Sequence, residues 1–230
     1  MDSILLGLVI LLGVAVGIML NFLGDWLPAR RGIINSPGWR RVRYWMVLIG
    51  AAACSVWLWL TPSEELGYFA GLLLLTFFGL IVIIDIEHKL ILFPTVWFGL
   101  GLCGLYGIFL HGWLTTLLGG LAGFGIMLVL FFFGDFVAQL IARIRKQELE
   151  EVALGFGDVN LAAIIGLLLG WPGIVGGIVL AIFVGGLVSI LYIFFTVIMG
   201  RYRTFEALPY GPYLVFGAVV LLFFGDTLLG

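Results

Sequence analysis

Long apolar runs separated by short polar breaks extend along the whole chain. A helix needs roughly 20 apolar residues to cross about 30 Å of hydrocarbon, and most of the runs approach or exceed this length. The sixth run is shorter, so its helix is expected to tilt, to thin the bilayer or to begin below the membrane surface. The pattern predicts an all-α, polytopic membrane helix bundle that forms a single membrane domain over residues 1–230. About eight transmembrane helices are expected, near residues 3–23, 45–60, 67–84, 93–110, 114–141, 159–170, 173–199 and 209–225.

The composition supports a membrane protein. Of the 230 residues, 63% are hydrophobic and only 10% are charged. A soluble domain of this size does not bury so much apolar surface, so membrane lipids are the expected surroundings. The formal net charge of −2 comes from sparse charges of both signs. This distribution argues against an extended nucleic-acid-binding surface, and no nucleic-acid partner is expected.

The positions of the basic residues predict the orientation of the bundle. All 11 Lys and Arg residues lie in the segments after the first, third, fifth and seventh predicted spans. In an alternating path these segments share one side of the membrane, and Lys and Arg are enriched on the cytosolic side. Residues 24–44 are therefore predicted to form a short basic cytosolic loop, with both termini outside the cytosol. The basic residues are Arg30, Arg31, Arg40, Arg41, Arg43, Lys89, Arg143, Arg145, Lys146, Arg201 and Arg203.

Two aspartates stand at the predicted cytosolic ends of spans. Asp85 closes the third apolar run, and Asp158 opens the sixth. An ionisable group at the edge of the hydrocarbon is expensive to desolvate, so it is by default functional or paired. A structural alternative exists for Asp158, which could be the N-cap of the sixth helix. Asp135, inside the fifth run, could support the site or mark the point where that helix leaves the membrane.

The residues before Asp158 form a GxGD element, Gly155-Phe156-Gly157-Asp158. Glycines beside an aspartate remove side-chain bulk and permit unusual backbone angles. A peptide chain could then come close to the carboxylate. The four-residue pattern is weak alone and gains weight from a second aspartate at the cytosolic edge of another span.

Three segments in order resemble the prepilin peptidase family. They are residues 85–92, which begin with Asp85 and contain Glu87 and His88; residues 155–163, followed by Gly166 and Gly170; and residues 208–214, with Pro209, Gly211 and Pro212. The resemblance implies a peptidase core over residues 67–225 with Asp85 and Asp158 as catalytic residues. Gly155, Gly157, Glu87, His88, Asn160, Pro209, Gly211 and Pro212 are the supporting motif residues. Asn160 departs from the family, which commonly has Lys there.

A further departure concerns the first loop. Members of the family with two activities carry there a cytosolic insert with two CxxC pairs, associated with zinc and with N-methylation of the product. Residues 24–44 contain no cysteine, and Cys54 and Cys103 match no zinc-ligand spacing. The sequence therefore predicts a peptidase with no metal site and no cofactor, and N-methyltransferase activity is not expected.

The resemblance also implies a substrate. It is a pilin-like precursor with a short basic leader on the cytosolic side and an apolar helix behind it, cut at the cytosolic face of the inner, or plasma, membrane. Two carboxylates that share one proton would activate water and protonate the leaving group. Acidic residues could bind the basic leader. Alternatively, the acidic residues after the fifth span could only solvate the end of the fifth helix. The acidic residues are Glu87, Glu148, Glu150 and Glu151.

Two other classes of protein use membrane aspartates. Presenilin and signal-peptide peptidase share GxGD, but they have Tyr before the first Asp and a Pro-Ala-Leu element. In this chain Ile84 precedes Asp85, and the order is Ala207-Leu208-Pro209. A transporter or channel could use Asp85 and Asp158 to bind protons or cations. That alternative predicts charges near mid-membrane and related halves of the chain, and neither pattern is evident.

Overall fold

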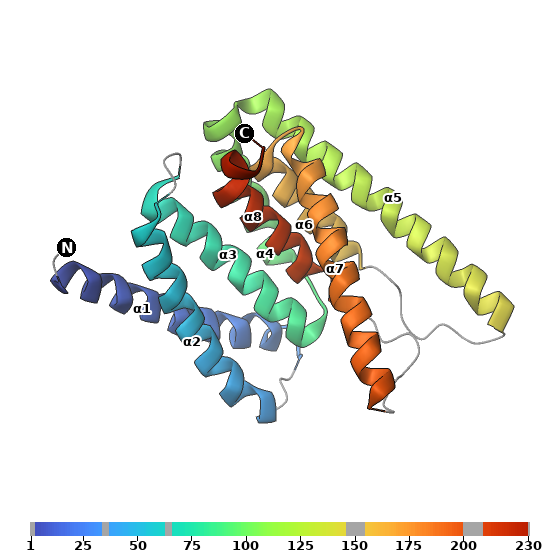
Figure 1. Cartoon of the computed structure of the whole chain (residues 1–230), viewed down its shortest axis with the longest axis horizontal. Helices are drawn as coiled ribbons and strands as arrows, with labels where there is room; N and C mark the ends of the chain where they lie inside the picture. The colour runs from blue at the N-terminus through green and yellow to red at the C-terminus, as the bar shows by residue number, and fades with distance from the viewer. Residues whose placement is uncertain (1–2, 34–36, 63–65, 146–154, 200–208, 230) are drawn as a thin grey trace. The chain divides into compact units, whose positions relative to one another are not determined.

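The computed structural model describes residues 3–33, 37–62, 66–145, 155–199 and 209–229 (Figure 1). These residues form helices joined by short connections, and the described part contains no strand. The prediction of an all-helical chain is therefore confirmed. The helices are α1 (Ser3–Ala29), α2 (Pro37–Leu60), α3 (Gly67–His88), α4 (Phe93–His111), α5 (Trp113–Arg145), α6 (Phe156–Leu169), α7 (Gly173–Ile198) and α8 (Gly211–Leu229).

Each predicted span coincides with a helix, and six of the helices are long and apolar enough to cross a membrane. The other two, α6 and α8, have shorter apolar stretches. The 14 residues of α6 rise only about 21 Å at 1.5 Å per residue, which agrees with the short sixth run in the sequence.

The structure differs from the expectation of a loop over residues 24–44. Helix α1 continues to Ala29 and α2 begins at Pro37, so most of this basic segment is helical. The physical reason is that the end of an apolar run marks where a helix leaves hydrocarbon, and not where its backbone hydrogen bonds end. The arginines at the start of α2 are good helix formers. Pro37 at the start of α2 follows the preference of proline for the first turn.

The chain packs as two compact units, Met1–His88 and Lys89–Gly230, and each is described by itself. In the first unit α1, α2 and α3 all contact one another. Small residues bring α1 and α2 close together, since a Cβ built on Gly13 would lie 2.7 Å from Cα of Ala52. The hydroxyl of Ser55 on α2 donates a hydrogen bond to the carbonyl of Val9 on α1 at 2.8 Å.

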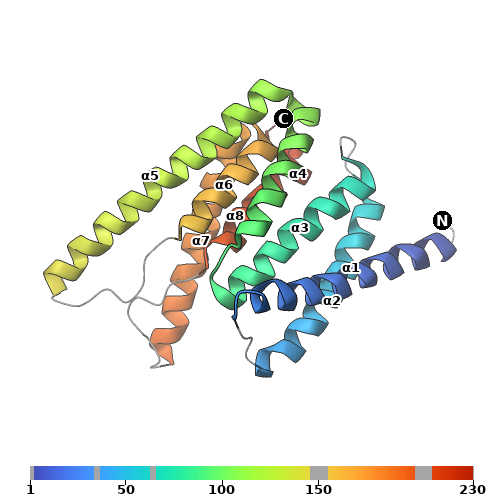
Figure 2. The same cartoon turned by 180° about the vertical axis from the view of Figure 1, so that it is seen from behind.

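In the second unit α6 contacts α4, α5, α7 and α8 (Figure 2). Its most extensive contact is with α5, where glycines of the two helices come close together. A Cβ on Gly166 would lie 2.2 Å from the carbonyl oxygen of Gly119, and a Cβ on Gly123 would lie 2.3 Å from that of Ala162. In lipid, where packing drives helix association, such small residues permit contact between backbones. The glycine-rich stretch of α5 thus fixes the helix that carries Asp158.

Candidate active site

Asp158 lies in the first turn of α6 and is only 7% exposed. The helix is capped by Gly155, whose N–H donates a hydrogen bond to Oδ2 of Asp158 at 3.1 Å. In return the N–H of Asp158 donates to the carbonyl of Gly155 at 3.0 Å. Asp158 is therefore not the N-cap residue considered in the sequence analysis. It is the third residue of the helix, and its carboxylate closes the cap.

The two glycines of the GxGD element differ in their surroundings. A Cβ on Gly157 would lie 2.9 Å from Cβ of Ile91, in the connection between α3 and α4. A Cβ on Gly155 would lie 3.6 Å from Oδ2 of Asp158, an ordinary contact. Gly155 has a φ of −83°, and neither glycine has a positive φ. The expectation of unusual backbone angles was therefore wrong. What Gly157 provides is the absence of a side chain, which permits the close contact with Ile91.

Aromatic packing holds the start of α6 against α5. The ring of Phe156, inside the GxGD element, makes edge contacts with Phe124 at 6.5 Å and Phe131 at 6.1 Å between centroids. Such aromatic pairs add to the apolar contact between two helices. The variable position of the motif therefore anchors the turn that carries Asp158.

Tyr210 is an electrostatic neighbour of Asp158 that sequence reasoning did not single out. Burial, and secondly the negative charge of Asp158, raise the pKa of Tyr210 to about 12. The Tyr210 carbonyl accepts hydrogen bonds from the N–H groups of Tyr213 at 3.1 Å and Leu214 at 3.3 Å, so this residue lies directly before the first residue of α8. The signal in the sequence was the position of Tyr210 inside the Pro209 to Pro212 element.

The supporting residues of that element have local roles. Gly211 is the first residue of α8 and is buried, and Pro212 follows it in the first turn, where a proline is well tolerated. Pro209 is half-buried just before the helix, and Asn160 is half-buried in α6. These residues lie in the second unit with Asp158 and Tyr210, and their supporting role in the site stays a prediction.

Asp85 lies in the last turn of α3 and is 4% exposed. Ile81 and Ile84, on the same stretch of helix, are each 2% exposed. Beyond His88 the helix ends at Lys89, which has a positive φ of 52°. The prediction that both aspartates stand at helix ends is confirmed.

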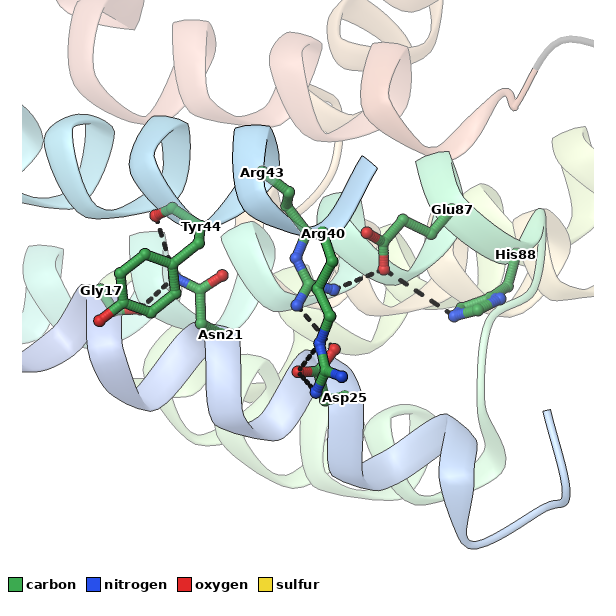
Figure 3. A network of polar contacts seen from close by, with 8 residues as sticks. All are labelled: Gly17, Asn21, Asp25, Arg40, Arg43, Tyr44, Glu87 and His88. Carbon is green, nitrogen blue, oxygen red and sulfur yellow. Dashed lines mark hydrogen bonds and ion pairs between the residues drawn. The ribbon is translucent and has the colours of Figure 1, made fainter. Parts of the chain in front are cut away.

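A chain of alternating charges joins the three helices of the first unit and includes Glu87, two residues after Asp85 in the sequence (Figure 3). Arg43 on α2 donates from Nη1 to Oε2 of Glu87 on α3 at 2.6 Å and from Nη2 to Oδ1 of Asp25 on α1 at 2.7 Å. Arg40 donates from Nε at 3.0 Å and from Nη2 at 2.5 Å to Oδ2 of Asp25. We call Asp25, Arg40, Arg43 and Glu87 the Arg43 cluster. Asn21 lies beside it and donates from Nδ2 to the carbonyl of Tyr44 at 3.3 Å.

The ion pair between Arg43 and Glu87 is buried, so the loss of either partner should lower the stability of the fold. The side chains of Arg43 and Glu87 are 5% and 9% exposed, whereas that of Arg40 is 60% exposed. Removing one partner of a buried ion pair typically costs about 3–5 kcal/mol, because the other charge is left without compensation. The exposed Arg40 pair contributes much less. Sequence reasoning placed Arg43 in a cytosolic loop and missed its burial, although a carboxylate at the end of an apolar helix indicates the need for such a partner.

The other acidic residues have different surroundings. Glu87 is bound to Arg43, which argues against its reading a substrate leader. Nε2 of His88 is 3.9 Å from Oε2 of Glu87. Asp135 accepts a hydrogen bond from Gln139 on its own helix at 2.9 Å. Glu148, Glu150 and Glu151 lie outside the described residues.

The structure thus brings the predicted residues together in two groups. Asp85, Glu87 and His88 belong to the first unit, and Asp158 belongs to the second with the GxGD glycines. The approach of Asp85 to Asp158 stays a prediction. Among the described residues no group of three or more His, Cys, Asp or Glu side chains could hold a metal ion.

Comparison with known proteins decides the family. The sequence profile of the type IV leader peptidase family matches residues 72–190, a range that contains both Asp85 and Asp158. The chain belongs to the type IV leader peptidase family. With its six long apolar helices, this family member is an integral membrane protein.

Curated relatives of this leader peptidase family member are named prepilin leader peptidase/N-methyltransferase. The protein from Aeromonas hydrophila is 26% identical over 207 residues, which are 88% of this chain and 65% of the relative. The protein from Aeromonas salmonicida is 26% identical over 81% of this chain and 60% of its own length. One from Burkholderia pseudomallei is 36% identical over 72 residues, 31% of this chain and 22% of that protein. The chain thus spans less than two thirds of the length of these relatives, and no solved structure matches it.

Proposed function

We propose that this chain is an intramembrane aspartyl endopeptidase that removes the cytosolic leader peptide from type IV pilin-like precursors. The observation that carries the proposal is the family match, because the matched residues include both membrane-edge aspartates. Both side chains are buried at helix ends, where an ionisable group needs a functional or structural reason. Asp158 has a structural partner in Gly155, but capping alone does not explain the second aspartate.

The reaction needs both carboxylates at the scissile peptide bond. One must take a proton from water while the other protonates the carbonyl oxygen or the leaving amine. Asp158 stands at the N-terminus of α6, where the helix dipole favours negative charge, and Asp85 stands at the C-terminal end of α3, where the dipole disfavours it. We therefore assign the general base to Asp158 and the general acid to Asp85.

The substrate is a pilin-like precursor with a short basic leader and an apolar helix. The names of the curated relatives support this class of substrate. The apolar helix of the precursor would lie in the same lipid phase as the bundle, with its leader junction at the membrane surface. In the sequence all 11 basic residues lie near the C-terminal end of an odd-numbered helix or near the start of the helix that follows it. Because Lys and Arg are enriched on the cytosolic side, we expect this surface to be the cytosolic face of the plasma membrane, with both termini outside.

The proposed enzyme works without zinc and without a methyl donor. Residues 24–44 contain no cysteine and, where described, are mostly helical. A zinc site needs thiolate or imidazole ligands at suitable spacing, and this segment has neither Cys nor His. We expect the cleaved product to keep an unmethylated N-terminus.

A cleavage assay tests the function. The purified protein in liposomes is mixed with a prepilin-like substrate, and the products are identified by mass spectrometry. Asp85→Asn and Asp158→Asn should each lower kcat by about 10²–10⁴-fold, the usual contribution of a general acid or base. Asp135→Asn is the matched control, because Asp135 is an aspartate of α5 paired with Gln139 on the same helix, and it should keep wild-type activity.

Two outcomes would contradict the proposal. Full activity of either the Asp85 or the Asp158 variant would remove that residue from catalysis. Proton or cation flux through the liposomes without proteolysis would instead support the transporter alternative, which the family match does not favour.

A further inference from the structure

The last turn of α3 is electrostatically unfavourable when considered alone. It carries two carboxylates, Asp85 and Glu87, at the end of the helix where the carbonyl groups leave a partial negative charge. The basic residue of that turn is His88. The final carbonyl groups of a helix also lack partners within it, so such a turn tends to fray.

Arg43 brings a buried positive charge to this turn from α2. Its guanidinium binds Glu87 at 2.6 Å and Asp25 at 2.7 Å, and the side chain is 5% exposed. Figure 3 shows the guanidinium between the two carboxylates, which come from α3 and α1. One buried cation thus ties the end of α3 to both other helices of the first unit.

The contact is made on the side of α3 away from Asp85. Two residues along a helix correspond to a rotation of about 200°, so Glu87 and Asp85 point in nearly opposite directions. Arg43 therefore contacts the last turn of α3 on the face that carries Glu87, and does not occupy the opposite face, which carries Asp85.

We propose that Arg43 is a positioning residue for Asp85, holding the last turn of α3 through Glu87 and balancing the charge beside the aspartate. This inference rests on the proposed peptidase function. The charged and titratable groups that face Glu87 within the first unit are Arg43 from α2, with Asp25 of α1 behind it, and His88 on α3 itself.

Charge-neutral variants separate positioning from simple packing. Arg43→Gln leaves the buried Glu87 without its partner, and we expect kcat to fall about 10–100-fold with KM changed less than about threefold. The double variant Arg43→Gln/Glu87→Gln removes both charges, and its two amides can hydrogen-bond to each other. We expect it to recover to within about threefold of the wild-type kcat. Arg41→Gln is the matched control, since Arg41 is an exposed arginine on the same helix, and it should behave as wild type.

The pH profile gives a second measurement that packing alone would not change. Glu87→Gln keeps the shape of the side chain and leaves Arg43 positively charged, because a guanidinium does not lose its proton. The added net positive charge near Asp85 should move the pH–rate profile to lower pH by about 0.5–1 unit. In the double variant the net charge is that of the wild type, and the profile should return.

The experiments test the peptidase function and the positioning role of Arg43 separately. If the wild type does not cleave a prepilin-like substrate, the peptidase function itself fails. If the wild type cleaves but Glu87→Gln leaves the pH profile unchanged, or the double variant is no better than Arg43→Gln, the positioning role of Arg43 is overturned. Should Arg43→Gln fail to fold, Glu87→Gln and the double variant still provide the pH test.

Discussion

The backbone N–H of Gly155 donates a hydrogen bond to Oδ2 of Asp158 across 3.1 Å. The carboxylate proposed to act on the substrate therefore also closes the start of the helix that carries it. Loss of activity in a variant of Asp158 could come from either role, so the two roles must be separated by experiment.

Two substitutions of Asp158 should separate them. Asp158→Asn keeps an oxygen that can accept the hydrogen bond from Gly155, whereas Asp158→Ala removes it. We expect both variants to lose about 10²–10⁴-fold in kcat, and Asp158→Ala to be less stable than Asp158→Asn by about 1 kcal/mol, the usual value of a helix cap. Thermal unfolding in detergent measures the difference. Equal stabilities would show that the cap contributes nothing.

Gly157→Ala should destabilise the protein through contact with Ile91. The new Cβ would lie 2.9 Å from Cβ of Ile91, so the start of α6 or the connection before α4 must shift. Overpacking of this kind typically costs about 1–3 kcal/mol, and a shift of Asp158 should lower kcat as well. Thermal unfolding and the cleavage assay measure the two effects.

Gly155→Ala is the comparison within the same motif. Its Cβ would make an ordinary contact at 3.6 Å, and Gly155 has a φ of −83°, which alanine adopts readily. The expected cost is below about 1 kcal/mol, because alanine is only a poorer N-cap than glycine. If Gly155→Ala were the more damaging change, the packing explanation for Gly157 would be wrong.

Tyr210 should report the charge of Asp158. Burial and the charge of Asp158 raise its pKa to about 12, above the value of about 10 for an unfolded tyrosine. The fold thus favours the neutral phenol, and this contribution to stability is complete below pH 10 and lost as the pH rises through 12. In Asp158→Asn one cause is removed, so Tyr210 should ionise at lower pH.

The ultraviolet absorbance of tyrosinate measures this titration. The signal of Tyr210 is obtained as the difference between each protein and the same protein carrying Tyr210→Phe. Asp135→Asn is the control, because the causes of the raised pKa of Tyr210 are burial and Asp158, and Asp135 is not one of them. This variant should leave the titration of Tyr210 unchanged. An identical titration in wild type and Asp158→Asn would contradict the electrostatic link.

Gly166→Ala should disrupt the contact between α5 and α6. The Cβ would lie 2.2 Å from the carbonyl oxygen of Gly119, which is backbone and cannot move aside alone. We expect a loss of about 1–3 kcal/mol and a lower yield of folded protein in detergent. Gly125→Ala on α5 is the control, since no atom lies within 4 Å of its Cβ position. Equal stability of the two variants would show that the helices separate without cost.

Much of the architecture could be predicted from the sequence. Each apolar run became a helix, and Asp85 and Asp158 lie at helix ends as expected. The limits of the first two helices could not be predicted, because hydropathy reports the edge of the hydrocarbon, and a helix continues as long as its backbone hydrogen bonds do. Residues 24–29 and 37–44 are helical although they are polar or charged in part.

Only the tertiary structure decided which residues support the two aspartates. In the sequence Arg43 is one of five basic residues between the first two predicted spans, and Gly157 is one of 34 glycines. The burial of Arg43 between Asp25 and Glu87, and the contact of Gly157 with Ile91, depend on distances between segments far apart in the chain. Local patterns determine which segments are apolar and helical, because backbone hydrogen bonding and lipid solvation act residue by residue. They do not determine which partner a buried charge or a glycine meets, because that is set by how whole helices pack.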